Sequence, residues 1–243
     1  MTARLYCPLP LATGDLFDLP EGPAHHAARV LRLRTGDELM VFNGEGGEFA
    51  ARIERADARA VAVSVGAWRN IERESALAVT LVQGLAAGDR MDYAIQKAVE
   101  LGVAAVQPVM TERSIARLDA ARAEKRVGHW QQIAISACEQ CGRNRIAPVL
   151  PLRDLDAWLR QPSRASLRLL LAPTAEATLT ALPRPTGAIE CLVGPEGGLA
   201  PEEAAAALRV GFTAVRLGPR ILRSETAASA ALGALNTLWG DWR

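Results

Sequence analysis

The stretch LVGPEGGLAPEE, residues 192–203, joins an apolar, strand-like run to an acidic, helix-like one. Between the two runs lies the sequence Gly194-Pro195-Glu196-Gly197-Gly198. Glycines and a proline at this density suit a backbone that turns sharply or lies close to another group. Ligands of open parallel sheets bind beyond the carboxyl ends of the strands. The stretch therefore predicts a binding loop at the end of a buried strand.

From about residue 76 onward, short apolar runs alternate with helical patterns. We expect strands in ALAVTLVQGL (76–85), VAAVQPVM (103–110), LRLLLAP (167–173), IECLVG (189–194) and TAVRLG (213–218). Helices are expected in DRMDYAIQKAVELG (89–102), with Met91, Ile95, Ala98, Val99 and Leu101 inward and Gly102 as its stop, in AEKRVGHWQQIAISACEQCG (123–142), and in AASAALGAL (227–235). This alternation predicts an α/β domain built on a parallel sheet.

The first 70 residues have a different sequence pattern, which is rich in β-strand signals. LMVFNGEGGEFAARI (39–53) has apolar runs on both sides of a glycine-rich turn, which predicts a hairpin. RAVAVSVGAW (59–68) predicts a further strand, and a short helix ending at Gly36 is expected in GPAHHAARVLRLRTGD (22–37). These elements favour a small barrel. The charged segment RNIERES (69–75) marks the expected boundary between domains 1–70 and 76–243.

Composition excludes some classes of protein and leaves others open. The net charge of +1 does not indicate a nucleic-acid partner, although only Lys97 and Lys125 among 28 basic residues are lysines. Genomic composition bias explains that excess of arginine better than phosphate binding does, since alanine is also abundant. Cys138 and Cys141 lack a second ligand pair, so two thiols on a helix are favoured over a metal or redox site. Few cysteines, no apolar leader and no long apolar run favour the cytoplasm.

Three loops follow expected strands and qualify as binding loops: LLLAP (169–173), LVGPEGG (192–198) and LGPRILRSETA (217–227). The third adds charged groups near the end of the sequence. LGPRILRSETA (217–227) repeats the Gly-Pro that follows the strand at 189–194. Neither loop has the spacing of a dinucleotide fingerprint or a phosphate loop. The loops suit close contact with a neutral ring and a ribose better than with a phosphate chain. The helix that follows is dense in small residues, which suits tight packing against a core, a loop or a partner subunit.

Several motifs occur together and in a fixed order along the whole chain. They are RVLRLRTGD (29–37), IQKAVELGV (95–103), TERS (111–114), ACEQCGRNR (137–145), GPEGGL (194–199) and LGPRILRSETA (217–227). This set resembles the bacterial 16S ribosomal RNA uridine N3-methyltransferase family, which belongs to the knotted SPOUT class. Three positions depart from the family pattern: Ala87 replaces a common lysine, Ala200 a capping serine, and Ser224 a usual threonine. The change at Ala200 is expected to cost about 1 kcal/mol of helix capping.

The resemblance implies a fold, a cofactor and partners. It implies a PUA-like β-barrel that holds RNA over residues 1–70, followed by a SPOUT-like α/β domain with a trefoil knot. It implies a homodimer, with 16S ribosomal RNA or the small ribosomal subunit as substrate and S-adenosylmethionine as cofactor, and no membrane partner. The positions that the resemblance places against the cofactor are Ala172, Pro173, Gly194, Pro195, Glu196, Gly197, Leu217, Gly218, Ile221, Leu222 and Ala227.

The resemblance also implies roles in catalysis and in RNA binding. Arg223 is expected to supply positive charge or to grip a phosphate, and Glu196 and Glu225 to accept a proton or to orient a donor. Each carboxylate has a simpler interpretation as a helix cap or a dipole partner. Glu139 and Gln140 are expected to face the same site, together with Arg143. The residues expected to bind RNA are Arg4, His26, Arg29, Arg32, Arg113, Arg143 and Arg145.

Three other functions remain open on the sequence alone. The first is a knotted-class methyltransferase that acts on another RNA nucleotide. The second is a non-catalytic RNA-binding or ribosome-assembly protein, which would have no need of intact GPEGG and RILRSETA loops. The third is a nucleotide-binding enzyme on an ordinary doubly wound sheet, and VQGLAAGD (82–89) lacks the phosphate-binding glycines that it requires.

Overall fold

The computed structural model describes residues 2–57, 60–114 and 118–242, which form two compact units. The N-terminal unit comprises Met1–Glu74 together with Cys138–Ile146. The C-terminal unit comprises Ser75–Ala137 together with Ala147–Arg243. The sequence did not indicate that residues 138–146 belong with the first unit.

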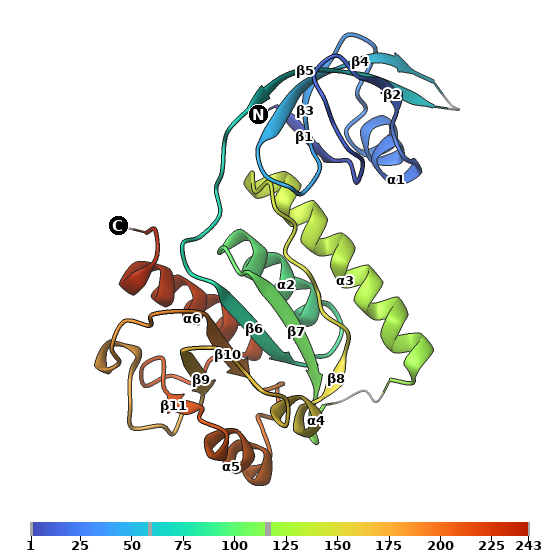
Figure 1. Ribbon diagram of the computed structural model, residues 1–243. Coiled ribbons are helices and arrows are strands. Elements are labelled where there is room, and N and C mark those ends of the chain that lie inside the picture. The colour runs from blue at the N-terminus through green and yellow to red at the C-terminus, as the bar shows by residue number, and fades with distance from the viewer. Residues whose placement is uncertain (1, 58–59, 115–117, 243) are drawn as a thin grey trace. The chain divides into compact units, whose positions relative to one another are not determined.

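The N-terminal unit is built on a five-stranded mixed sheet in the order β1-β3-β4-β5-β2 (Figure 1). Its strands are β1 (Ala3–Tyr6), β2 (Leu16–Asp18), β3 (Glu38–Phe42), β4 (Glu48–Ala56) and β5 (Val61–Arg69). Strands β3 and β4 pair antiparallel as the predicted hairpin, and Gly44, Gly46 and Gly47 have positive φ in their connection. Alternate residues such as Leu39, Val41 and Ile53 are buried in one core.

The helix expected to end at Gly36 is shorter than predicted. Helix α1 (Glu21–His25) continues into a π-helical turn (His26–Val30), and the chain then leaves the helix at Leu31. Arg32 takes a φ of 55°, which no helix can continue through. The turn lets Leu33 pack against the core of this unit. The prediction was wrong because this contact outweighs helical propensity over residues 31–36.

The C-terminal unit contains a six-stranded, all-parallel sheet in the order β11-β9-β10-β6-β7-β8 (Figure 1). The strands are β6 (Val79–Gly84), β7 (Ala105–Met110), β8 (Arg153–Asp154), β9 (Leu167–Leu171), β10 (Ile189–Val193) and β11 (Thr213–Val215). The helices are α2 (Asp89–Glu100), α3 (Ala120–Cys141), α4 (Leu155–Leu159), the 3-10 turn η2 (Leu179–Ala181), α5 (Pro201–Arg209) and α6 (Ser224–Trp239). The predicted parallel α/β architecture is confirmed, although the short β8 and α4 were not expected.

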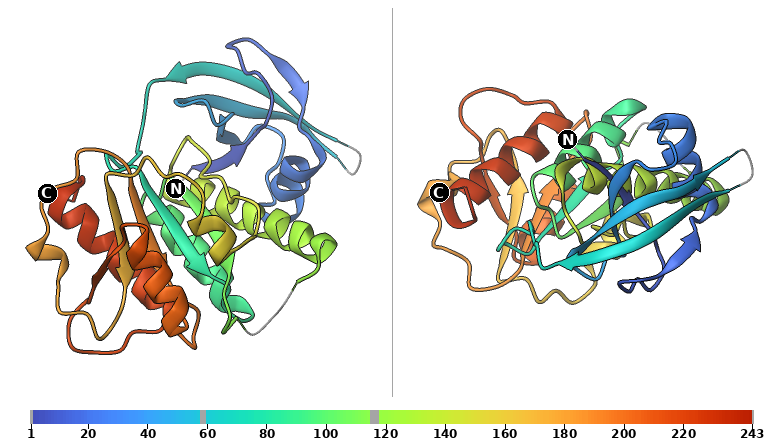
Figure 2. Two further views of the ribbon diagram at one scale, coloured as in Figure 1. Left: turned by 60° about the horizontal axis from the view of Figure 1, so that its bottom comes forward. Right: turned by 90° about the horizontal axis from the view of Figure 1, so that it is seen from above.

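Helices cover this sheet by burying apolar stripes. In α2 the buried residues include Met91, Ile95 and Val99, as the periodicity predicted, and Gly102 follows with a φ of 79°. Helix α2 packs against α6, which contacts β6 and β10 (Figure 2, α6 in red). Helices α4 and α5 share a second cluster with Val82 and Leu192 from the strands. The sheet is therefore buried on both faces, as parallel sheets usually are.

The segment after β11 returns to the centre of the sheet. Val215, the last residue of β11, accepts from Ala172 N–H, and Arg216 N–H, directly after the strand, donates to the Ala177 carbonyl, so the segment starts against the loop after β9. Ser224 then reaches the loop after β10. The trefoil knot itself stays a prediction. Within the described chain, no helix combines the length and apolar character needed to cross a membrane.

Candidate functional site

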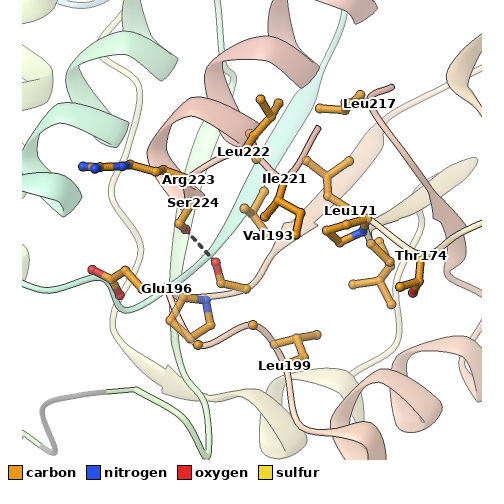
Figure 3. A pocket seen from close by; sticks show the side chains of 18 of the residues that line it. Leu171, Thr174, Val193, Glu196, Leu199, Leu217, Ile221, Leu222, Arg223 and Ser224 are labelled. Atoms are coloured by element: carbon orange, nitrogen blue, oxygen red, sulfur yellow. Dashed lines mark hydrogen bonds between the residues drawn. The ribbon is translucent and has the colours of Figure 1, made fainter. Parts of the chain in front are cut away.

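The loops after β9, β10 and β11 meet around one cavity of about 680 Å³ (Figure 3). All eleven positions expected to contact the cofactor line it: Ala172, Pro173, Gly194, Pro195, Glu196, Gly197, Leu217, Gly218, Ile221, Leu222 and Ala227. Arg223 also lines it, together with residues that the sequence did not single out, among them Arg90, Val193 and Leu199. The structure therefore brings three separate sequence motifs to one place.

The GPEGG loop folds tightly because several of its neighbours leave no room for a side chain. A Cβ on Gly194 would lie 3.0 Å from the Leu199 nitrogen. A Cβ on Gly84, at the end of β6, would lie 2.7 Å from the backbone nitrogen of Pro195. These distances are too short for any other residue without movement of the backbone. The glycines therefore set how closely the loop approaches the ends of strands β6 and β10.

A buried hydrogen-bond chain fixes the start of the loop. The Gln83 amide Nε2 donates to Ser224 Oγ at 2.8 Å. Ser224 Oγ in turn donates to the Gly194 carbonyl at 2.6 Å, which is the dashed line in Figure 3. Gln83 is fully buried, and its Nε2 also donates to the Gly84 carbonyl at 3.0 Å. A serine is sufficient at position 224, where the family usually has threonine, because the hydroxyl group makes both contacts.

The other end of the loop is held from the end of β7. Arg113 Nη1 donates to the Gly197 carbonyl at 3.0 Å. The Glu203 carboxylate accepts from Glu112 N–H at 2.8 Å and from Ala200 N–H at 2.9 Å. Glu203 therefore satisfies a backbone donor at the start of α5, where Ala200 offers no capping side chain of its own.

Glu196 connects the loop to the segment that follows β6. Its Oε1 accepts from Ala87 N–H at 2.9 Å and from Arg90 Nη1 at 2.8 Å. Partial burial favours the neutral carboxyl, but these hydrogen bonds outweigh it and hold the pKa of Glu196 below its ordinary value. Glu196 is therefore an ionised, hydrogen-bonded carboxylate at neutral pH.

Arg223 and Glu225 differ in how they relate to the cavity. Arg223 precedes the first residue of α6 and is exposed, and within the described residues its guanidinium has no hydrogen bond or ion pair. Figure 3 shows Arg223 and Glu196 on the same side of the cavity, across from Thr174. Glu225 does not line the cavity among the described residues, but its Oε2 is buried without a hydrogen-bond partner there. Its charge acts on Arg90 and raises the pKa of that guanidinium, after the larger effect of Glu196.

Much of the remaining lining is apolar, although Thr174 and Arg220 also contribute to it. Leu171, Val193, Leu199 and Leu222 line the cavity, and the Ile221 side chain is 85% exposed. It is unusual for a large aliphatic side chain beside a cavity to be so exposed to solvent, and such a side chain suits contact with a bound ring. Among the described residues, no group of three His, Cys, Asp or Glu side chains could hold a metal ion.

The residues expected to bind RNA have different environments. Arg29, Arg32 and Arg145 are exposed, and Arg145 Nε lies 3.7 Å from Glu72 Oε2. Arg113 is exposed but bonded to Gly197. Arg4 is paired with Glu48, and the buried Arg143 donates from Nε to Glu74 Oε2 at 2.9 Å. His26 Nδ1 lies 3.2 Å from Glu139 Oε2. These roles all stay predictions. The exposed arginines would break the fewest existing contacts on binding RNA.

Glu139 and Gln140 lie with Arg143 in the N-terminal unit, and none of the three is among the described residues that line the cavity. Tyr6 N–H donates to Glu139 Oε1 at 2.9 Å, which ties the end of α3 to β1. Burial raises the pKa of Glu139 above its ordinary value. The expectation that these residues face the loops around the cavity stays a prediction.

The sequence did not single out Arg90 and Gln83, although each had a recognisable signal. Gln83 is a polar residue near the carboxyl end of an otherwise apolar strand. Arg90 stands in the first turn of the helix after that strand. In a parallel sheet, both positions point to the edge where ligands bind.

Comparisons with known proteins agree with this geometry. Residues 73–236 match an RNA methyltransferase domain family, and residues 19–66 match an RNA methyltransferase PUA domain. The chain is 31% identical to Ribosomal RNA small subunit methyltransferase E of Buchnera aphidicola from Schizaphis graminum, over 98% of this chain and 97% of the relative. It is 34% identical to the protein of that name in Mycobacterium tuberculosis, over 95% of this chain and 89% of the relative.

Two solved structures are similar over almost the whole chain. One is the Ribosomal RNA small subunit methyltransferase E of Neisseria gonorrhoeae bound to S-adenosylmethionine, with 41% identity, a TM-score of 0.92 and full coverage of both chains. The other is Lpg2936 of Legionella pneumophila with bound S-adenosylmethionine, with 38% identity, a TM-score of 0.95 and coverage of 99% of each chain.

Proposed function

The chain belongs to the RNA methyltransferase family, and on that basis we propose that it transfers a methyl group from S-adenosylmethionine to N3 of a specific uridine in 16S ribosomal RNA. One observation carries the proposal. The eleven residues that the sequence motifs nominate for the cofactor come from three separate loops, and all of them line a single cavity.

The residues that line the cavity fit this cofactor. A volume of about 680 Å³ lies within the usual range for a ligand of that size. The loops after β9, β10 and β11 offer backbone groups at glycines and apolar side chains such as Leu199 and Ile221, which suit an adenine and a ribose. The Neisseria gonorrhoeae structure, solved with S-adenosylmethionine, supports the same assignment. When bound, the cofactor supplies an electrophilic methyl group on a sulfonium.

The residues of this chain then have to prepare the acceptor. Uridine N3 carries a proton at neutral pH, and its lone pair attacks poorly until that proton leaves. The side chains must therefore hold the base in line, favour loss of the proton and stabilise the resulting negative charge. We assign to Arg223 the role of stabilising this negative charge or of binding the target phosphate. We assign to Glu225 the role of accepting the proton or of orienting a donor. Glu196 is assigned to positioning, because its hydrogen bonds keep it ionised and make it a weak base.

The two parts of the chain divide the work in this proposal. Residues 1–70 form a PUA-like RNA-binding domain, and residues 76–243 form the SPOUT-like methyltransferase domain. The match of residues 19–66 to a PUA domain of RNA methyltransferases supports the first assignment. The RNA contacts assigned to the first domain are Arg29 and Arg32, together with Arg4 and His26. The further RNA contacts that we assign are Arg113, Arg143 and Arg145.

We also propose that the protein acts as a homodimer in the cytoplasm. Support for the dimer comes from α6, which is rich in alanine and begins at the cavity, so a second copy can pack closely against it. Light scattering after size exclusion measures the mass directly, and a mass of one chain at assay concentrations would contradict the dimer.

The experiment that tests the function is a methyl-transfer assay. Purified protein is incubated with labelled S-adenosylmethionine and unmethylated small ribosomal subunits, with naked 16S RNA in parallel, and the nucleosides are identified by mass spectrometry. We expect N3-methyluridine. Another methylated nucleoside would move the function to a different target within the same class. No transfer and no cofactor binding by calorimetry would favour a non-catalytic RNA-binding protein.

A further inference from the structure

We infer that Arg90 is a catalytic residue, whose guanidinium group is held in place by Glu196 and stabilises the negative charge that develops on the uracil ring when N3 loses its proton. The inference rests on the proposed function and names a residue that neither the sequence motifs nor the family resemblance assigns.

Arg90 is placed to reach a base in the cavity. It is the second residue of α2, directly beyond the carboxyl end of β6, and it lines the cavity together with Pro195 and Gly197. Its side chain is 43% exposed, so the group is not withdrawn into the protein core.

The guanidinium group is also fixed before any substrate binds. Arg90 Nη1 lies 2.8 Å from Glu196 Oε1, and that oxygen is itself fixed by Ala87 N–H at 2.9 Å. Preorganised donors stabilise developing charge better than mobile ones, because they need not reorganise during the reaction. Within the described residues, Arg223 has no such partner, so it can follow a phosphate but is less suited to a fixed position beside the ring.

A purely structural role leaves part of this arrangement unexplained. Ala87 N–H alone already ties Glu196 to the segment after β6. The bond to Glu196 uses Nη1, while a guanidinium group has five N–H donors. The remaining N–H donors of this exposed guanidinium group are suited to carbonyl oxygens, and uracil has a carbonyl group on each side of N3.

The chemistry balances without a further reactant. The N3–H bond breaks and its proton leaves to a carboxylate or to water. The electron pair left on N3, which is shared with the two flanking carbonyl oxygens, forms the new N–CH₃ bond. The C–S bond of the sulfonium breaks, and its electrons return to sulfur to give a neutral thioether. A cation at the carbonyl oxygens favours the first step by lowering the pKa of N3.

Glu196 is a positioning residue in this scheme. It does not have to take up the proton, because its pKa is held below the ordinary value by the same hydrogen bonds that position Arg90. Glu225 interacts electrostatically with Arg90 and has a buried oxygen without a partner among the described residues, but it does not line the cavity, so the proton can also leave to water.

The test compares Arg90→Met and Arg90→Lys with the control Arg209→Met, an exposed arginine in the last turn of α5 that does not line the cavity. Single-turnover methyl transfer to unmethylated small subunits is measured as a function of pH at saturating cofactor. We expect Arg90→Met to lose about 100-fold in rate near neutral pH. Its rate should recover at higher pH, because the variant requires hydroxide to remove the proton that wild type loses more easily. Arg90→Lys should keep part of the rate.

Calorimetry of cofactor binding and thermal melting supply readouts that do not depend on activity. We expect both variants to melt like wild type and to bind the cofactor within about threefold of it. Glu196→Gln provides a second variant: it should slow the reaction, and the double variant with Arg90→Met should be no slower than Arg90→Met alone. Either of two results overturns the inference: an unchanged rate, or a slow rate with an unshifted pH profile and a cofactor affinity lowered in proportion. If wild type makes no N3-methyluridine, the proposed function fails first, whatever Arg90 does.

Discussion

Ser224 Oγ donates a hydrogen bond to the Gly194 carbonyl at 2.6 Å, and this contact joins the first residue of α6 to the first residue of the GPEGG loop. The Gln83 amide donates to the same hydroxyl at 2.8 Å. Three elements far apart in the sequence therefore meet at one buried hydroxyl group. The loop that lines the cavity owes its position to this group as much as to its own glycines.

Removal of the hydroxyl should loosen the cavity. In Ser224→Ala the buried Gln83 amide and the Gly194 carbonyl both lose a partner, which should cost about 1–3 kcal/mol of unfolding free energy and weaken cofactor binding. Ser224→Thr retains a hydroxyl group and should match wild type in both stability and cofactor binding. Urea denaturation and calorimetry measure the two effects, and a Thr variant as impaired as the Ala variant would contradict this role.

Gly84→Ala should weaken cofactor binding by a steric effect. The new Cβ would lie 2.7 Å from the Pro195 nitrogen, so the GPEGG loop must move away from β6. We expect the cofactor affinity to fall at least about tenfold and stability to fall by about 1–3 kcal/mol. Calorimetry and thermal melting report the two quantities.

Gly128→Ala is the matched control for that substitution. Gly128 lies within α3, and a Cβ there would meet no atom within 4 Å. The variant should bind the cofactor normally and be more stable by about 0.5–1 kcal/mol, because alanine is a better helix former. If Gly84→Ala binds the cofactor as tightly as wild type, the GPEGG loop moves without loss of affinity, and the steric explanation is contradicted.

Glu139 should give the protein a distinct pH dependence. Burial raises the pKa of this carboxyl in the folded state, so the folded state binds the proton more tightly than the unfolded one. The stability that this group contributes is complete below its ordinary pKa of about 4.5 and is lost as the pH rises through the raised pKa. Glu139→Gln removes the titration but keeps an oxygen that can accept from Tyr6 N–H.

Urea unfolding of wild type and Glu139→Gln from pH 4 to 8 tests this expectation. The variant should gain stability relative to wild type as the pH rises from about 4.5, because only wild type loses the contribution. A constant difference across that range would mean that Glu139 titrates normally in the folded protein.

Replacing Arg29 and Arg32 together by alanine should weaken RNA binding without affecting the cofactor. Both side chains are exposed in the segment that follows α1. If each neutralises one phosphate, the slope of log affinity against log salt should fall by about 1.5 for the pair. Filter binding to 16S RNA over a salt series measures the slope, with Arg209→Ala as control. An unchanged slope would remove these residues from the RNA surface.

The sequence predicted the fold best where periodicity was strong. The stripe of Met91, Ile95 and Val99 identified α2, and the glycine-rich turn between β3 and β4 identified the hairpin. The helix before Gly36 was extended too far because local propensity cannot register that Leu33 packs against a distant core. The boundary near residue 70 could not reveal residues 138–146 in the N-terminal unit, because their membership depends on contacts with β1 and residues 71–74.

The candidate site shows the same division. The Gly-Pro loops are local features that carry the family resemblance, and that resemblance nominated the eleven positions that line the cavity. Arg90 and Gln83 were not nominated: their positions gave only a weak signal, and their partners Glu196 and Ser224 lie more than a hundred residues away. The contact of Glu139 with β1 could not be foreseen for a similar reason: a helix end does not show which unit it packs against.

Residues 138–146 belong to the N-terminal unit, although they follow a helix whose first part belongs to the other unit. The covalent chain thus passes from one unit to the other after Glu74, again within α3, and once more after Ile146. A fragment that stops near residue 74 lacks the Glu139 acceptor for Tyr6 and the Asn144 amide that donates to the Ile71 carbonyl. The first 74 residues are therefore not a portable cassette. A chimera that takes its RNA-binding unit from a relative needs that relative's counterpart of residues 138–146 as well.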